Sequence, residues 1–228
     1  TPLYSSAASD VYKRQILIYI CIFLTLSFLG HSYIIYRFIH DGVLFTGPND
    51  GIEQMIPIQM FLFDKWSVGN LFYATDFGLG GDFFTDLSYY FSTNILFIIN
   101  VLCIILLKTF IHINTQGLLF WMVNALVIST IKAALAMYCT YLYSKFISRN
   151  TWISIIMAFL FVMSPLYYRF TVYWPFFSDV FIWMPLLLFS IERTLQKQKF
   201  GLFIVTITLI MINNFYFAYY LCLIGAGY

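Results

Sequence analysis

The chain alternates between long apolar runs and short polar connections. The runs that approach the length of a membrane-spanning helix lie at residues 16–36, 89–107, 118–143, 151–168, 176–191 and 202–224. A helix needs about 20 mostly apolar residues to cross about 30 Å of hydrocarbon. Pro165 and Pro185 interrupt two of these runs, which membrane helices tolerate when neighbouring groups satisfy the freed carbonyls. The pattern predicts an all-α, polytopic transmembrane helix bundle of about 5–6 spans.

Composition supports a membrane protein. Of the 228 residues, 61% are hydrophobic and only 10% are charged, whereas a soluble domain carries about 25% charged residues. So few charges cannot build a solvated surface, which excludes an ordinary soluble enzyme, a disordered region and a nucleic-acid binder. The expected environment is the lipid bilayer, with no nucleic acid as a partner.

Both ends of the chain have unusual sequences. Residues 1–15 begin with Thr rather than Met, and the stretch SSAASDVYKRQ within them resembles a translated sequencing adaptor. The other end stops inside an apolar run. We expect residues 1–15 to be a non-native tail. We expect residues 16–228 to be the N-terminal part of a multispanning domain, truncated at its C-terminus.

One long polar region, residues 37–88, separates the first apolar run from the others. It holds seven of the ten acidic residues of the chain, which are Asp41, Asp50, Glu53, Asp64, Asp76, Asp82 and Asp86. This concentration predicts a large acidic loop on one side of the membrane.

The positions of Lys and Arg near span ends predict the orientation, because cytoplasmic loops carry an excess of these residues. If residues 89–107 cross the membrane, five later bases fall outside, against this rule. If residues 89–117 stay outside as a re-entrant or surface-lying helix, the same bases fall inside. These bases are Lys145, Arg149, Arg193, Lys197 and Lys199. We favour the second arrangement, with five spans and an extracytoplasmic region over residues 37–117 that carries interfacial helices.

Residues 50–66 read as an amphipathic helix of the kind that lies at a membrane interface. Asp50 at its start is equally consistent with a helix cap and with a carboxylate that acts as a general base or metal ligand. Glu53 follows one turn later and is equally consistent with a solvated position. The glycine-rich stretch 76–86 favours a plain turn over a backbone that approaches a sugar or phosphate.

Two bases stand out among the apolar runs. Lys132 lies near the middle of residues 118–143, where an ammonium is costly to bury. It is consistent with a structural ion pair, for which Asp179 is a candidate partner, or with an anion-binding role. Arg169 lies shortly after Pro165. This position favours a role in anchoring a helix end over a role in phosphate binding.

Two further groups have structural interpretations. Interhelical hydrogen bonding explains Asn213 and Asn214 inside the last run. An aromatic belt explains the cluster of Tyr167, Tyr168, Tyr173 and Trp174.

The run NDGIEQMIPIQMFLFDKWSVGNLFYATDFGLGGDFFTDLSYYFSTNILFI resembles the first outer loop of bacterial YfhO-type membrane proteins. The matching positions are Asp50, Gln54, Asp64, Gly69, Leu71-Phe72-Tyr73, Gly78-Leu79-Gly80 and Tyr89-Tyr90. Outside the loop, Lys132, Pro185-Leu186, Glu192-Arg193 and Asn214-Phe215-Tyr216 are also similar to features of this family. The sequence departs from the family pattern at Asn49, Met55 and Ser92-Thr93-Asn94. The resemblance covers roughly residues 16–228.

The resemblance implies a GT-C-like glycosyltransferase in the bacterial cell membrane. Its donor would be a polyprenyl-phosphate-linked sugar, and its acceptor a cell-envelope polymer such as lipoteichoic acid on the extracytoplasmic face. Asp50 would be the catalytic base or orient the acceptor, and Glu53, Gln54 and Asp76 would line the site. Lys132 or Arg169 would hold the lipid phosphate through charge-assisted hydrogen bonds. A divalent metal is left open, and the fragment alone is expected to be inactive.

Two other functions stay open. Lys132 and the proline-broken runs are also consistent with a transporter or flippase for a lipid-linked substrate, although no internal repeat accompanies them. A non-catalytic scaffold for other envelope enzymes is a third alternative, which no particular residue supports.

Overall fold

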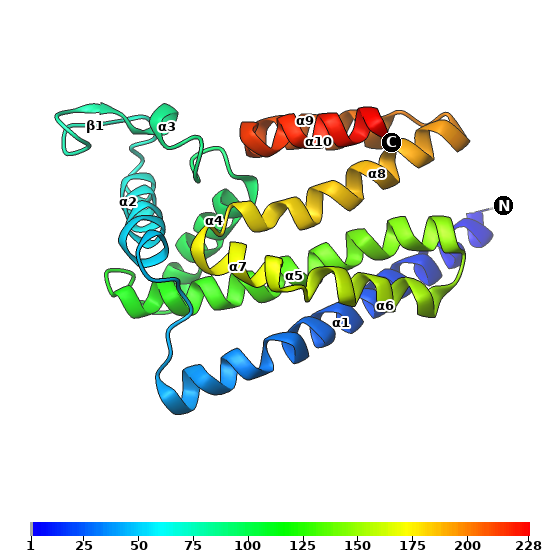
Figure 1. The fold of residues 1–228 in the computed structure, drawn as a ribbon, viewed down its shortest axis with the longest axis horizontal. Coiled ribbons are helices and arrows are strands. Elements are labelled where there is room, and N and C mark those ends of the chain that lie inside the picture. Colours follow the sequence, from blue (N-terminus) through cyan, green and yellow to red (C-terminus); the bar gives the residue numbers. More distant parts are fainter. Residues whose placement is uncertain (1) are drawn as a thin grey trace.

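The computed structural model describes the backbone of residues 2–228 and the side chains of residues 14–228. Figure 1 shows a molecule built almost entirely of helices. In chain order the elements are α1 (Pro2–Asp41), the π-helical η1 (Asp50–Met55), α2 (Ile56–Ser67), β1 (Tyr73–Ala74), β2 (Gly81–Asp82), α3 (Phe83–Asp86), α4 (Ile95–Phe110), α5 (Leu118–Ser148), α6 (Thr151–Val162), α7 (Pro165–Tyr173), the 3₁₀ turn η2 (Phe177–Asp179), α8 (Val180–Lys197), α9 (Gly201–Asn213) and α10 (Phe215–Gly227).

Two helices in the described part of the chain are long and apolar enough to cross a membrane. They are residues Arg14–Asp41 of α1 and the whole of α5, which match the predicted spans at 16–36 and 118–143. The helices α6 and α7 together would make a third span, with a bend of 46° between them. The bend lies just before Pro165, the first residue of α7, because proline lacks the N–H that would continue the hydrogen bonding of α6.

Residues 202–224, expected as one span, fold instead into the two antiparallel helices α9 and α10. Asn214 between them has an extended backbone, and its side chain accepts the N–H of Phe217 to cap α10. Phe203 in α9 and Gly225 in α10 line one groove, although a continuous helix would hold them about 33 Å apart. The prediction of a single span is therefore wrong, because the asparagine side chains find hydrogen-bond partners in other segments.

The helices run back and forth between two ends of a bundle (Figure 1). One end carries α2, the β1–β2 hairpin and the start of α5. We call it the acidic end because it holds residues 42–117, which contain six of the ten acidic residues of the chain. The other end carries the turns at residues 149–150 and 198–200, and we call it the basic end. Tyr228 also lies at the basic end, where its hydroxyl donates to Glu192 at 2.6 Å. Because residues 42–117 connect α1 to α5 and lie at the acidic end, the chain leaves α1 and enters α5 at that same end.

The helix α4 begins at Ile95, later than the predicted run 89–107, because the Asn94 side chain accepts the Phe97 N–H at 2.9 Å and caps it. Its 16 residues extend about 24 Å, less than the hydrocarbon thickness of about 30 Å. This length favours the arrangement that keeps α4 on one side.

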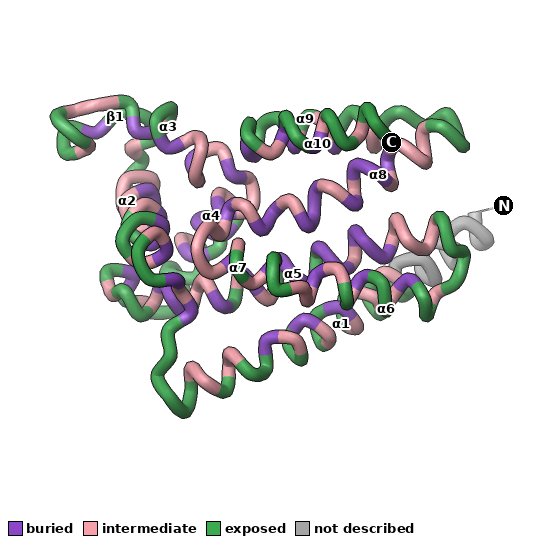
Figure 2. The backbone as a smooth tube through the Cα atoms, viewed as in Figure 1, coloured by how far each residue is buried: buried purple, intermediate pink, exposed green. Residues whose placement is uncertain are grey.

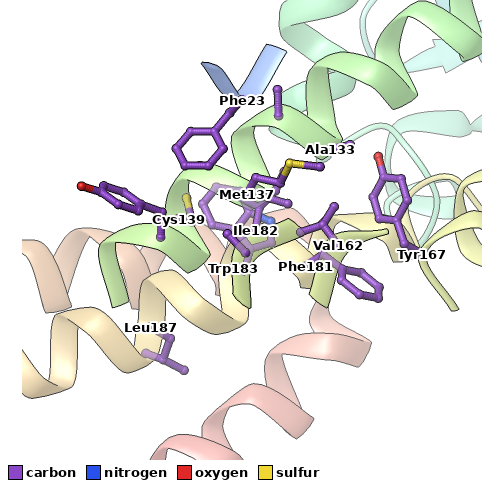
Figure 3. Packing of buried hydrophobic residues seen from close by; sticks show 14 of the residues in the cluster. Phe23, Ala133, Met137, Cys139, Val162, Tyr167, Phe181, Ile182, Trp183 and Leu187 are labelled. Atoms are coloured by element: carbon purple, nitrogen blue, oxygen red, sulfur yellow. The ribbon is translucent and has the colours of Figure 1, made fainter. Parts of the chain in front are cut away.

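The described residues form two apolar cores. The larger lies inside the bundle, where Phe23 of α1, Met137 of α5 and Trp183 of α8 pack together (Figure 3). The smaller lies under η1 and α2 at the acidic end and includes Phe63 and Trp121, whose ring centroids are 5.4 Å apart. Figure 2 shows residues 14–41 of α1 exposed along much of their length, as expected of a helix that faces lipid.

The predicted amphipathic helix at residues 50–66 is confirmed as the continuous run of η1 and α2. Met55, Ile56, Leu62 and Phe63 are buried, and Glu53, Gln54 and Pro57 are exposed. The helix lies across the ends of the bundle helices in Figure 1, the direction expected of a helix that lies in the plane of an interface.

Candidate functional site

The Asp50 carboxylate is held by a distant part of the chain. The indole N–H of Trp174 donates to Asp50 Oδ2 at 2.9 Å, and the Gln54 amide lies 3.4 Å from Oδ1. The helix itself begins after Asn49, whose φ is 58°. The interpretation of Asp50 as a helix cap is wrong, because its hydrogen bonds run to side chains. Asp50 is half-buried, and these two hydrogen bonds orient its carboxylate.

Two glycines allow this contact. The Gly47 N–H donates to the Val172 carbonyl of α7 at 3.0 Å. A Cβ on Gly51 would lie 2.8 Å from Thr46 Oγ1 and 2.9 Å from the same Val172 carbonyl, and a Cβ on Gly47 would lie 2.5 Å from the Tyr173 ring. The loop therefore lies directly on α7, as only glycine permits.

Glu53 and Gln54 lie beside Asp50 on the exposed surface of η1. Residues three and four positions apart on a helix are neighbours, so these side chains share the surface that Asp50 reaches. Three of the predicted site residues are thus brought together.

Asp76 lies elsewhere. Both of its carboxylate oxygens accept from Lys65 Nζ, at 2.6 and 2.7 Å. These hydrogen bonds hold the pKa of Asp76 below its ordinary value. Lys65 follows Asp50 by fifteen residues of continuous helix, which is about 20 Å. The structure therefore does not bring Asp76 to Asp50, because Asp76 binds Lys65 at the far end of α2.

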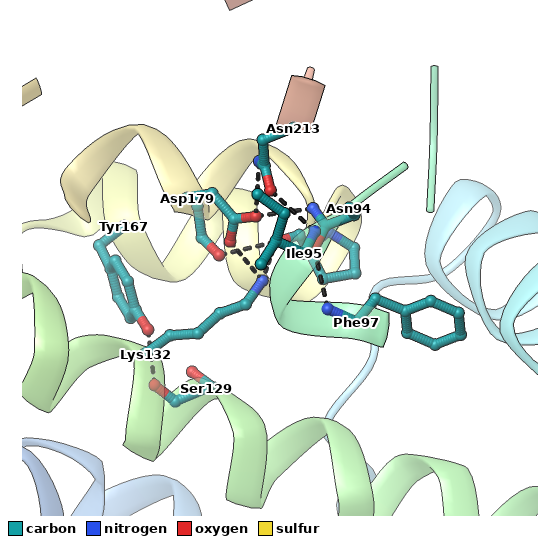
Figure 4. A network of polar contacts seen from close by, with 10 residues as sticks. Asn94, Ile95, Phe97, Ser129, Lys132, Tyr167, Asp179 and Asn213 are labelled. Carbon is teal, nitrogen blue, oxygen red and sulfur yellow. Dashed lines mark hydrogen bonds and ion pairs between the residues drawn. The ribbon is translucent and has the colours of Figure 1, made fainter. Parts of the chain in front are cut away.

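Lys132 forms the buried ion pair that the sequence allowed. Its Nζ lies 2.6 Å from Asp179 Oδ1 and donates to the Pro175 carbonyl at 2.8 Å. The amides of Asn94 and Asn213 donate to Asp179 Oδ2 at 2.7 and 3.2 Å. Figure 4 shows these groups converging from α5, the start of α4, the start of α8 and the end of α9. The pair is almost fully buried, and its hydrogen-bonded neighbours offset the cost of removing both charges from water.

A small cavity of about 30 Å³, lined by both polar and apolar residues, adjoins this ion pair. Besides Lys132, the polar side chains that line it come from four helices and are Gln59, Asn94, Asn100, Asn124, Ser129 and Thr171. A cavity of this size with several polar groups in its wall can hold a water molecule. The cavity lies where the acidic end meets the bundle.

Two consecutive residues connect these features. Trp174 donates to Asp50, and the carbonyl of the next residue, Pro175, accepts from Lys132. The surface carboxylate and the buried ion pair are therefore parts of one hydrogen-bonded assembly.

Arg169 is exposed on α7, one turn before Tyr173, which packs against Gly47. Tyr167 and Tyr168 depart from the predicted aromatic belt. Tyr167 is fully buried and donates to the Ser129 carbonyl at 2.6 Å, and the Tyr168 hydroxyl donates to the Gly30 carbonyl at 2.7 Å. These tyrosines tie α7 to α5 and α1, and so fix the helix that presents Trp174.

Among the residues with described side chains, no three His, Cys, Asp or Glu residues gather around a common point. The divalent metal that the sequence left open therefore has no ready-made group of three such ligands in this part of the chain.

Comparison with known proteins identifies the family. The family described as "Bacterial membrane protein YfhO" matches residues 23–228. The chain belongs to the YfhO family of bacterial membrane proteins. A relative from Bacillus subtilis (strain 168), described as "Uncharacterized protein YfhO", is 36% identical over 207 residues. That match covers 91% of the chain but 24% of the relative, so the chain spans about a quarter of that protein's length. No solved structure matches the chain.

The residues that carried the YfhO resemblance lie mainly at the acidic end. Tyr73 pairs with Asp82 in the antiparallel β1–β2 hairpin. Gly80 has a φ of 99°, and a Cβ there would lie 2.7 Å from the Tyr73 hydroxyl. Residues 76–86 thus contain the tight turn that the glycines predicted.

Sequence reasoning missed three residues with polar groups in or beside the hydrogen-bonded assembly around Asp50 and the Lys132–Asp179 pair. Asn94 bonds to Asp179, and Trp174 holds Asp50. Gln59 lies on the apolar face of α2, yet it is buried and lines the cavity. A polar residue on an apolar helix face was a usable signal for Gln59. No local pattern marks the other two, because their partners lie 85 and 124 residues away.

Proposed function

We propose that the protein is a membrane glycosyltransferase with a GT-C-like fold. It transfers a sugar from a polyprenyl-phosphate donor to a cell-envelope polymer such as lipoteichoic acid, on the extracytoplasmic face. The observation that carries this proposal is the half-buried Asp50 carboxylate, oriented by Trp174 at the acidic end of a membrane protein.

In this proposal Asp50 acts as the general base. Its carboxylate takes the proton of an acceptor hydroxyl as the hydroxyl oxygen attacks the anomeric carbon. The bond between that carbon and the phosphate oxygen breaks, and the polyprenyl phosphate leaves with the bonding electrons. The hydrogen bond from Trp174 leaves one oxygen of Asp50 oriented for this transfer. Glu53 and Gln54 line the acceptor side.

Arg169 is the better of the two bases for the lipid phosphate. It is exposed on the helix that packs against the Asp50 loop, and a guanidinium binds phosphate oxygens in pairs. Lys132 would have to leave Asp179 to reach a ligand. In the assignment we favour, Lys132 therefore holds the position of Pro175, and Asp76 stays outside the reacting centre.

The charges of the two ends support the orientation. Bases that the positive-inside rule assigns to the cytoplasm lie at the basic end, near the C-terminal ends of α5 and α8 and in the turns that follow. Asp50 lies at the other end, which would then face the outside.

The test is Asp50→Asn in the full-length protein, with Asp86→Asn as the matched control because Asp86 is an exposed carboxylate of the same region. We expect envelope-polymer glycosylation to fall by about 10²-fold or more with Asp50→Asn and to stay unchanged with Asp86→Asn. Unchanged glycosylation with Asp50→Asn at normal expression would exclude the catalytic role.

A transporter or flippase for a lipid-linked substrate is the second candidate. The break between α6 and α7 and the buried Lys132–Asp179 pair favour it, because transporters place charged groups beside interrupted helices. Purified full-length protein in detergent separates the two. Sugar transfer from a lipid donor to an acceptor would exclude pure transport, whereas donor movement across liposomes without transfer would favour it.

A further inference from the structure

We propose that a groove at the basic end binds the phosphate headgroup of an anionic phospholipid. The groove lies between the C-terminal ends of α5 and α8 and has a volume of about 420 Å³. Three cationic side chains line it, Lys145 and Arg149 from the end of α5 and Lys197 from the end of α8. This site lies at the opposite end of the bundle from Asp50.

The cationic groups are held by neutral contacts. Lys145 Nζ donates to Thr151 Oγ1 at 2.6 Å and to the Arg149 carbonyl at 3.2 Å. Lys197 Nζ lies 5.5 Å from the centre of the Phe146 ring. In the described part of the chain, no ion pair involves these three residues. Their positive charge is therefore available to an anion.

The nearest carboxylate along α8 is already engaged. Glu192 Oε2 accepts from Gln196 at 2.7 Å, and Oε1 accepts from Tyr228 at 2.6 Å. Glu192 is not among the residues that line the groove. The groove thus combines three bases with no acid of its own.

The floor of the groove selects a lipid over a free phosphate. Leu142, Phe146 and Phe189 line it, and the two aromatic rings pack edge to face with centroids 5.7 Å apart. Leu142 and Phe146 belong to α5, a helix long enough to cross the membrane. An anionic phospholipid matches both parts, because its phosphate meets the bases while its glycerol and upper acyl chain cover the apolar floor. Basic clusters between helices near the membrane surface bind such headgroups.

The test compares two variants of the full-length protein that each lose two positive charges at the same end. Arg149→Gln with Lys197→Gln removes bases that line the groove. Arg193→Gln with Lys199→Gln removes bases that do not line it. Binding of phosphatidylglycerol and of phosphatidylcholine to the detergent-solubilised proteins is measured by native mass spectrometry, with thermal melting as the check on folding.

We expect phosphatidylglycerol to bind about tenfold more weakly to the groove variant and within twofold of the wild type to the control variant. Phosphatidylcholine binding should not differ among the three proteins. Equal loss in both variants would overturn the proposal, because the effect would then come from net charge alone. Competition by glycerol 3-phosphate at the concentration of the lipid would also overturn it, since the floor would then add nothing.

Discussion

The two ends of the bundle differ in how their charged side chains are paired. The ion pairs formed by described side chains all belong to the acidic end or to its junction with the bundle, and they are Arg37–Asp41, Lys65–Asp76 and Lys132–Asp179. At the basic end, Lys145 and Lys197 contact only neutral groups of the protein. Described ion pairs therefore contribute to the structure at and near the acidic end, whereas Lys145 and Lys197 at the basic end leave positive charge for the surroundings.

Breaking the buried ion pair should have the largest effect. We expect Lys132→Met to lower the free energy of unfolding by about 3–5 kcal/mol, because Asp179 would remain buried without its partner. Adding Asp179→Asn should recover much of this loss. Lys197→Met, the counterpart at the basic end, should change stability by less than about 0.5 kcal/mol. Denaturant unfolding in detergent measures all three, and equal losses from the two lysines would contradict the contrast between the ends.

A Cβ at Gly51 should have the next largest effect. The added methyl group of Gly51→Ala would clash with Thr46 and the Val172 carbonyl. We expect this overpacking to lower the free energy of unfolding by about 1–3 kcal/mol. Gly117→Ala is the matched control, because no atom lies within 4 Å of a Cβ there. The loop around Asp50 should become accessible to protease in the first variant and remain protected in the second. Protection in both would show that the loop does not depend on this close approach.

Removing one hydrogen bond from Asp50 should affect activity more than stability. Trp174→Phe keeps an aromatic ring and loses the N–H that Asp50 accepts. We expect about 1 kcal/mol of lost stability and a clear fall in envelope-polymer glycosylation. Trp152→Phe serves as the control, since Trp152 is 76% exposed. If glycosylation falls equally in both variants, Trp174 has no special role in orienting the carboxylate.

The pH response should be the smallest effect and should be confined to the acidic end. Lys65 lowers the pKa of Asp76, and the hydroxyl and N–H of Thr85 lower the pKa of Asp82, both from 3.8. A lowered pKa in the folded state means that the stabilisation is present above pH 3.8 and is lost as the pH falls through the folded-state pKa. Hydrogen exchange of the β1–β2 hairpin should therefore quicken below pH 3.8.

The variant Asp76→Asn tests this origin. It should abolish the part of the increase in hydrogen exchange that comes from the Lys65–Asp76 pair, and it should leave the part that comes from Asp82. The turn at residues 149–150, which contains no carboxylate side chain, should not respond in this pH range. A response of equal size in that turn would mean that acid acts on the whole molecule.

The sequence predicted features that depend on local pattern. The length of the apolar runs identified the membrane-spanning parts of α1 and α5, and the helical spacing of polar and apolar residues identified the amphipathic run of η1 and α2. It did not predict the break at Asn214, since apolar runs on both sides of that residue read as one span. Hydropathy averages over a window and cannot show where a side chain finds a better partner.

The candidate site was predicted only in part, for a related reason. Asp50, Glu53 and Gln54 lie within one helical turn, so their proximity followed from spacing alone. The pairing of Lys132 with Asp179 was a candidate, because a buried ammonium needs a counter-charge. The hold of Trp174 on Asp50 was not foreseen, because it depends on how α7 packs against a loop more than a hundred residues earlier.

The adjacency of Trp174 and Pro175 has a consequence for ligand binding. Trp174 contacts the surface carboxylate and Pro175 contacts the buried lysine, so a displacement of this dipeptide backbone would change both contacts together. By thermodynamic reciprocity, a ligand that acts on Lys132 through this dipeptide and a ligand that binds at Asp50 would change each other's affinity by the same factor. Two neighbouring residues thus give the protein a short path for energetic coupling between its surface and its interior.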